Sequence, residues 1–473
     1  MTEPPFGFGP GAGSGDDPGE PGGTGSGGPL GPFGSMGPLG PMGDPQQFAA
    51  ALRQFADLMS WQGGPVNWDL AKNIARQTVA QKGDASVLET DRSKVIEALR
   101  LADLWLEDAT EFPSGIRTSQ AWSRSEWVEA TLPVWSKLCD PIAARAVEAM
   151  SGLFGGDPAE LAGDLPPEVQ AMVSGLGGLG GLGGMLQRIG GMMVGGQTGA
   201  AVGALAEEVV SSTDVGLPLG PEGTAALLPA GVAAFGAGLS VELDEVRLFL
   251  ALREAAHHRL FAHVPWLRSR LLGAVEDYAR GIKVDTSALR DAMPQIDPSN
   301  PEAINEALSG AALFQPEDTP EQKAALARLE TVLALVEGWV ATVVATAASN
   351  RLPQAAALAE AIRRRRATGG PAERTFATLV GLELRPRRLR EAAAIWQGLT
   401  DTRGVAERDR VWAHPDLLPT ADDFDDPDGF LRGKPELDLS DFGDEPGEPR
   451  GPQAPPEPPG AGPDDSEAGP QQD

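Results

Sequence analysis

The segment Leu250-Ala-Leu-Arg-Glu-Ala-Ala-His-His-Arg-Leu-Phe261 decides the fold class of this 473-residue chain. From Leu243 to Phe261, apolar residues recur at helical spacing and occupy two adjoining faces of the expected helix. The first face holds Leu243, Val246, Leu250, His257 and Phe261, and the second holds Phe249, Leu252, Ala256 and Leu260. A helix that is apolar over most of its circumference is usually buried. The segment therefore predicts a core helix, with Pro265 ending it and a further helix following from Trp266.

Other stretches show the same helical period and few β-branched alternations. Helices are expected to start near Gln46 and to cover about 67–81, 88–108 and 123–153, where Ala, Leu, Glu and Arg dominate. Another should begin at Thr319, which is a good N-cap before Pro320, and Gln322 completes a capping-box pattern. The fold class is therefore predicted as mainly α, with many helices in one core.

The two ends of the chain differ in composition from this core. Residues 1–45 are dominated by Gly and Pro with no Lys or Arg, and 431–473 are rich in Asp, Glu, Pro and Gly. Neither end has enough periodic apolar residues to offset the entropy of ordering. The sequence predicts disordered tails at 1–45 and 431–473 around a helical domain at 46–430. A role for the acidic C-terminal tail, in partner docking or in solubility, is left open.

Charge and cysteine content exclude some classes of protein. The net charge is −29, and the core remains acidic without the tails, which argues against nucleic acid as a partner. Cys139 is the only cysteine, so a disulfide within the chain and a Cys-rich metal site are excluded. No basic start followed by an apolar run indicates a signal peptide. These features predict a cytoplasmic location.

Residues 174–204 contain Leu-Gly-Gly repeats and allow two interpretations. The first is membrane contact, but Arg188 interrupts the run and glycine is too frequent for a stable isolated span. The second is close packing of helices through small residues, or an ordered loop. We favour the second and expect no membrane span.

The core helix carries a pattern with catalytic chemistry. Glu254 and His257 stand three residues apart, so they project from nearly the same face. In a His-Glu-x-x-His zinc-protease helix, the two histidines bind the metal and the glutamate activates the bound water. Here Arg253 replaces the first histidine, and a guanidinium has no lone pair for zinc. A Glu-x-x-His pair also occurs by chance, and His257 and His258 could instead be hydrogen-bonded core histidines.

Glu337 is a second unusual carboxylate. It lies inside an apolar helical stripe, four residues after Leu333, where a carboxylate needs a cation, a metal or a proton to be tolerated.

The stretch Leu250–Leu267 resembles the actinobacterial zincin-like metallopeptidases of the second type, a family of zinc-dependent metalloproteases or hydrolases. The resemblance extends over about 46–430. It also rests on the segments Asn67-Trp-Asp-Leu-Ala71, Gly216-Leu-Pro-Leu219, Val336-Glu-Gly-Trp-Val340, Gly381-Leu-Glu-Leu-Arg-Pro-Arg-Arg-Leu-Arg390 and His414-Pro-Asp-Leu-Leu-Pro-Thr420. It implies a zincin-like helical core that hydrolyses a peptide or similar amide. It also implies Glu254 as the base, with His257 and Glu337 as metal ligands.

The missing ligand at Arg253 leaves two outcomes open. In the first, zinc is lost and the Arg253 guanidinium takes the place of the metal, pairing with Glu337 or Glu254. In the second, a nearby histidine such as His258 or His263, or the distant His414, restores a zinc site. His258 points about 100° away from His257 on an ideal helix, so we favour the first outcome.

Function therefore divides into two hypotheses. One is a zincin-family hydrolase whose degenerate motif impairs or abolishes catalysis. The other is a non-catalytic scaffold, a pseudoenzyme on a protease fold, whose cleft binds a peptide or protein. The arginines at 363–366 and at 385–390 could form an anion or nucleic-acid patch, but no aromatic residues interleave with them. We favour helix C-terminal charge on a solvated face.

Overall fold

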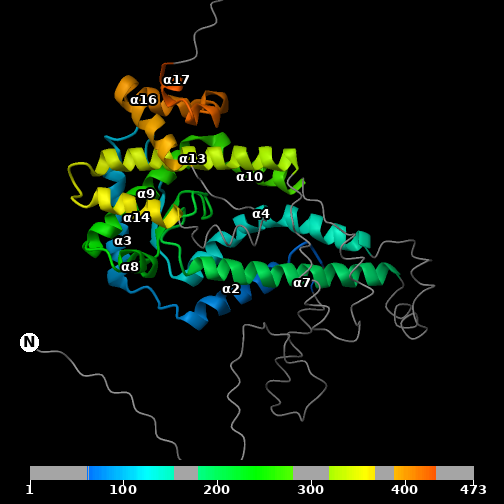
Figure 1. Cartoon of the computed structure of the whole chain (residues 1–473). Coiled ribbons are helices and arrows are strands. Elements are labelled where there is room, and N and C mark those ends of the chain that lie inside the picture. The colour runs from blue at the N-terminus through cyan, green and yellow to red at the C-terminus, as the bar shows by residue number, and fades with distance from the viewer. Residues whose placement is uncertain (1–60, 62, 154–178, 281–318, 368–387, 433–473) are drawn as a thin grey trace, which may run out of the picture. The chain divides into compact units, whose positions relative to one another are not determined.

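A computed structural model of the chain describes residues 61, 63–153, 179–280, 319–367 and 388–432. The helix expected near Gln46 lies outside this part. So do the predicted tails, except for residues 431 and 432. The elements in chain order are α2 (Trp68–Lys82), α3 (Glu89–Leu106), β1 (Thr118–Ala121), α4 (Arg124–Leu153), α7 (Leu179–Ala206), β2 (Thr224–Leu227), α8 (Pro229–Gly236), α9 (Leu243–His263), α10 (Pro265–Arg280), α13 (Pro320–Ala348), α14 (Ala355–Ala367), α16 (Leu389–Arg410) and α17 (Pro427–Arg432). Short 3-10 turns link α16 to α17. The mainly α prediction is confirmed (Figure 1).

Helix α9 is the central element that the opening segment predicted. It packs against α3, α13, α8 and β2, and every residue from Phe249 to Leu260 is buried. Helix α13 crosses it and also packs against α10 and α16. The start of α13 has the expected capping box, in which Thr319 and Gln322 bond each other's backbone N–H. Apolar side chains fix how these elements meet, and they leave buried polar residues on α9 and α13 facing one another.

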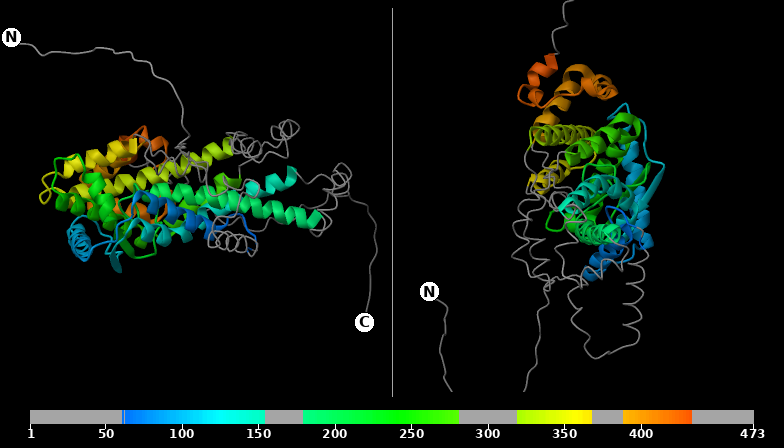
Figure 2. Two further views of the ribbon diagram at one scale, coloured as in Figure 1. Left: turned by 90° about the horizontal axis from the view of Figure 1, so that it is seen from below. Right: turned by 90° about the vertical axis from the view of Figure 1, so that its right-hand side faces the viewer.

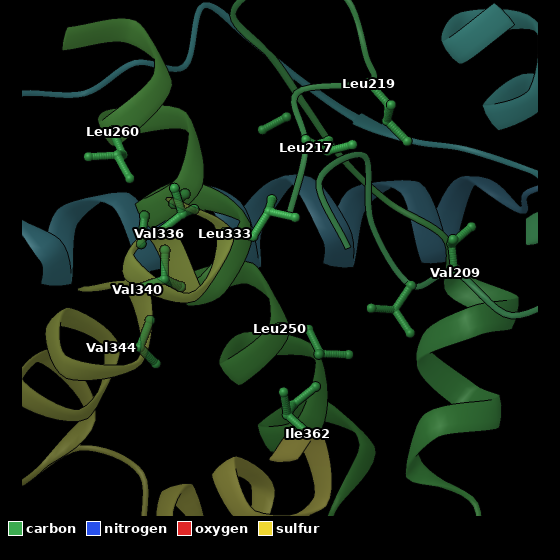
Figure 3. Close-up of a cluster of buried hydrophobic side chains, with 14 of the residues drawn as sticks. Val209, Leu217, Leu219, Leu250, Leu260, Leu333, Val336, Val340, Val344 and Ile362 are labelled. Carbon is green, nitrogen blue, oxygen red and sulfur yellow. The ribbon is translucent and has the colours of Figure 1, made fainter. Parts of the chain in front are cut away.

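Figure 3 shows this shared core. The labelled side chains come from α9, α13, α14 and the segment that precedes β2, and they are Leu250, Leu260, Leu333, Val336, Val340, Val344, Ile362, Val209, Leu217 and Leu219. Burial of large aliphatic side chains contributes roughly 1.5–3 kcal/mol each to stability. The same elements supply every polar residue of the site described below, so the core positions the site.

The glycine-rich stretch forms α7, which lies beside α2 and α4 (Figure 2). Gly195, Gly199 and Gly203 stand on the face toward α2, where a Cβ on Gly199 would lie 2.4 Å from the carbonyl oxygen of Ala71. Small residues let the two helix backbones approach this closely. The interpretation as helix packing is confirmed for Gly195, Gly199 and Gly203, whereas residues 174–178 of the repeat lie outside the described part.

Replacing Gly199 with alanine is expected to lower the free energy of unfolding by about 2 kcal/mol, since the added methyl group must push α7 from α2. Urea unfolding followed by circular dichroism measures the change. Gly273 in α10 is the matched control, because a Cβ there meets nothing within 4 Å. Its alanine variant should be neutral or more stable by up to about 1 kcal/mol. Equal effects at both positions would contradict the packing argument.

Strands β1 and β2 form a two-stranded parallel sheet, with Ala121 opposite Leu227. It packs beside α3 and α9. Within β2, the backbone N–H of Ala226 lies against α9 and donates to Glu254.

Within the described residues, α13 is long and apolar enough to cross a membrane, and 78% of its most apolar window is buried inside the protein. A core helix of a water-soluble protein passes the same test, so the length and composition of α13 are weak grounds for a span.

Candidate functional site

Arg253, His257 and Glu337 come together where α9 crosses α13. The Arg253 Nη2 atom lies 2.6 Å from Glu337 Oε2, and His257 Nε2 lies 3.1 Å from Glu337 Oε1. All three side chains are largely buried, with Glu337 only 3% exposed. The cation that a carboxylate in this apolar stripe requires is thus an arginine of the neighbouring helix.

The ring of His257 is held on both sides. Its Nδ1 lies 2.8 Å from the backbone carbonyl oxygen of Arg253, one helical turn earlier. A carbonyl only accepts, so Nδ1 is the donor and Nε2 faces Glu337. Metal-binding histidines are often held in the same way, with one ring nitrogen donating to a backbone carbonyl and the other facing the metal. Nε2 is directed at the carboxylate, however, and the carboxylate is already shared with arginines.

A second arginine reaches the same carboxylate from α14. Arg366 Nη2 lies 2.8 Å from Glu337 Oε1 and donates to the backbone oxygen of Asp214 at 2.8 Å. Its neighbour Arg365 pairs with the Asp214 carboxylate at 3.1 Å. The interpretation of 363–366 as a solvated face missed Arg366. The sequence did contain a signal for this contact. Glu337 stands in an apolar helix and needs a cation, and four consecutive arginines are unusual in an acidic chain.

These charges set the protonation of Glu337. Burial alone would raise its pKa, but Arg366, Arg253 and His257 together lower it well below the ordinary value. Gly216 also approaches this carboxylate. It has a φ of +79°, and a Cβ there would lie 3.0 Å from Glu337 Oε1. The turn at 216 therefore closes the site from the side of the segment that precedes β2.

Glu254 lies in a separate cluster of hydrogen bonds. The Ser212 and Thr213 hydroxyls donate to its two oxygens, Thr213 N–H donates to Oε2 at 3.2 Å and Ala226 N–H to Oε1 at 3.1 Å. His258 Nε2 lies 3.2 Å from Oε1. Burial alone would raise the pKa of Glu254, but the contact with His258 and the two hydroxyl bonds lower it to about 2. The side chain is fully buried and faces the 212–226 segment.

The other histidines lie elsewhere. His258 joins the Glu254 cluster and is also 3.4 Å from the Ser212 hydroxyl. His263, at the exposed end of α9, stacks on Phe112. His414 is 64% exposed and contacts Asp416. The structure thus brings together Arg253, His257 and Glu337 of the predicted site, and places Glu254, His258 and His263 outside that contact.

The residues at this centre do not fit a zinc ion. Zinc sites in proteins use three or four nitrogen, sulfur or oxygen ligands. Among the described residues, no group of three or more His, Cys, Asp and Glu side chains gathers in a way that could hold a metal. His257 and Glu337 supply two donors, and the guanidinium groups of Arg253 and Arg366 contact the Glu337 oxygens. A dication there would meet two fixed positive charges.

A pocket of about 650 Å³ opens beside this centre. Arg253, Glu337 and Arg366 form part of its wall, and the rest comes from Phe249 of α9, from α13, from α14 and the connection between them, and from the start of α16. Pockets of this size suit small organic ligands. The centre therefore faces a space in which a ligand can reach the arginines.

The family profile described as zincin-like metallopeptidase matches residues 66–431. No curated protein matches the chain. Among solved structures, the crystal structure of a candidate hydrolase with a novel fold from Chloroflexus aurantiacus is similar at 20% identity and a TM-score of 0.53. That likeness covers 78% of this chain and 98% of the other, and at this identity it shows the fold alone. The profile match spans most of the chain, so this protein belongs to the zincin-like metallopeptidase family.

Proposed function

We propose that this chain is a non-catalytic, ligand-binding member of its family, in which arginine occupies the place of the metal. One observation carries the proposal. Each oxygen of Glu337, the residue that the family resemblance offers as a metal ligand, contacts a guanidinium group, with Arg253 on Oε2 and Arg366 on Oε1. An arginine pair satisfies the buried carboxylate without any ion. The pocket beside it remains available for binding.

The surroundings of Glu254 support the same proposal. A general base needs a free lone pair within reach of a substrate or water, and a pKa near the working pH. Glu254 accepts from two hydroxyls and two backbone N–H groups, and its pKa is lowered to about 2. We infer that this carboxylate holds the 212–226 segment against α9.

The competing function is zinc-dependent hydrolysis, as in members with a complete motif. Its support here is that His257 and Glu337 still lie 3.1 Å apart, in contact across two helices. The competing function requires that zinc displace both guanidinium groups from Glu337.

Metal content separates the two functions. The wild-type chain, purified with excess zinc and then desalted, is expected to hold far less than one zinc per chain by atomic spectroscopy. Arg253→His restores a third donor and removes one charge, so it should raise zinc content toward about one per chain. Arg270→His, on the exposed side of α10, controls for adventitious binding.

A wild-type protein with one tightly held zinc and peptidase activity that a chelator abolishes would overturn the proposal. An Arg253→His variant that gains no more zinc than Arg270→His would show that the centre has lost the geometry of a metal site.

A further inference from the structure

The pocket beside Glu337 has a positively charged wall in a strongly acidic protein. Its charged lining residues are four arginines, Arg253, Arg363, Arg366 and Arg390, against two glutamates, Glu337 and Glu360. The whole chain has a net charge of −29. A concave site whose sign opposes that of the molecule concentrates ions of one charge, here anions.

The excess charge is greatest at the buried inner end. Arg253 and Arg366 share the single carboxylate of Glu337, while Asp214 pairs with Arg365. These side chains are at least 70% buried, so water screens them incompletely. Among the described residues, these three arginines thus face two carboxylates. A guanidinium has five N–H donors, and among described residues Arg253 uses one nitrogen, on Glu337.

The outer end of the pocket differs from the inner end. Arg363 and Arg364 both pair with Glu360, and Arg363 is 43% exposed. Arg390 is exposed and has no ion-pair partner among the described residues. Exposed ion pairs contribute little to binding. An anionic group is therefore better placed at the inner end, while the outer arginines raise the local concentration of anions.

Between the two ends, the lining is apolar. Val344, Leu352, Ile362 and Phe249 line it together with alanines of α13 and α14. Ser349 is the one uncharged polar side chain among the lining residues, and its hydroxyl donates to the Thr346 carbonyl. A peptide would bring an N–H and a C=O per residue that need partners. The lining suits an aliphatic chain better than a peptide backbone.

We propose that this pocket binds a small amphiphilic anion, a carboxylate on an aliphatic chain, with its head on Arg253 and Arg366 and its tail along α13 and α14. The inference rests on the proposed function, because a zinc ion at Glu337 would need these arginines displaced. Arginine forks match the two oxygens of a carboxylate. The apolar wall then removes the tail from water.

Calorimetric titration of the full chain with dodecanoate, below its micelle concentration, tests the proposal. Saturable one-to-one binding is expected. Octanoate should bind at least about tenfold more weakly, because each methylene group buried contributes to affinity. Two further compounds should bind at least about tenfold more weakly than dodecanoate. Decyltrimethylammonium has a similar tail and the opposite charge, and acetyl-trileucine has a carboxylate on a peptide.

Two pairs of variants locate the ligand. Ala356→Trp fills the pocket from an exposed lining position, and Ala357→Trp is its neighbour on α14 that does not line it. The first should lower dodecanoate affinity at least about tenfold and the second by less than about twofold. Arg253→Gln should lower affinity about tenfold or more, and Arg390→Gln far less. Circular dichroism of each variant checks the fold.

The possible failures are distinct. Three results would overturn this inference even if zinc content stays near zero. They are equal effects of Ala356→Trp and Ala357→Trp, no saturable binding of dodecanoate, and tighter binding of the peptide or of the cation than of dodecanoate. A zinc-loaded, hydrolytic wild-type protein would overturn the proposed function and this inference with it, and zinc is measured on the same preparations.

Discussion

Replacing Glu337 with glutamine is expected to lower the free energy of unfolding by about 3–5 kcal/mol, the cost of breaking a buried ion pair by removing one partner. The carboxylate is 3% exposed and balances Arg253, Arg366 and the ring of His257. Glutamine keeps the size of the side chain but removes the charge, and its NH₂ group would face one of the guanidinium groups. Buried Arg253 and half-buried Arg366 would then lose the carboxylate that they share.

Urea unfolding of the wild type and of Glu337→Gln measures this loss. Because the pKa of Glu337 in the folded protein is below its ordinary value of 4.5, its contribution is complete above that value and is lost as pH falls below it. The difference between the two proteins should therefore be full at pH 7 and shrink toward pH 3. Glu360→Gln, whose carboxylate pairs with arginines at the solvent-facing end of the pocket, should change stability far less. A Glu337→Gln protein as stable as the wild type would show that the pairs contribute nothing.

Glu254→Gln is expected to cost at least about 3 kcal/mol, although the change is nearly isosteric. The Thr213 N–H donates to Oε2 and the Ala226 N–H donates to Oε1. Hydroxyl groups can rotate to suit an amide, but these two backbone donors cannot. Whichever oxygen becomes NH₂, one buried backbone N–H then faces another donor and loses its partner.

The same variant separates the structural role of Glu254 from a catalytic one. A base can be changed to glutamine with loss of turnover and little loss of stability, whereas a carboxylate that organises the 212–226 segment cannot. The control is Glu242→Gln, at the exposed N-terminus of the same helix, which should be nearly neutral. Burial alone would raise the pKa of Glu254, but His258 and the Ser212 and Thr213 hydroxyls lower it to about 2 in the folded protein, so its contribution is also lost as pH falls from 4.5 toward 2. A melting temperature unchanged by Glu254→Gln would contradict the structural role.

Much of the fold follows from periodicity and local signals. The apolar circumference of α9, the capping box of α13 and the small residues of α7 each have a local physical reason, and each was predictable. The strands were not, because Thr118–Ala121 and Thr224–Leu227 are four residues long and contain few β-branched residues. Their pairing joins segments that are about a hundred residues apart, and no local pattern encodes it.

The candidate site was predictable in part for the same reason. A carboxylate in an apolar stripe must have a partner, and an arginine in a ligand position is a natural candidate, so the meeting of Arg253 with Glu337 has a physical basis in sequence. Arg366 arrives from 29 residues further along, through the docking of α14. Glu254 and His257 share a helical face, but each reaches a different neighbour because α9 is surrounded on all sides. Tertiary packing decides these partners.

The contact between Arg253 and Glu337 has a consequence for how the protein depends on its supply of metal. A zincin held together by zinc is assembled only when the ion is available, and a chelator or mild acid can remove the ion. A guanidinium is synthesised as part of the chain and cannot be extracted or exchanged for a competing ion. If the proposed function holds, the centre of this protein is complete on folding, and we expect the shape of its pocket to stay the same under metal starvation and metal excess.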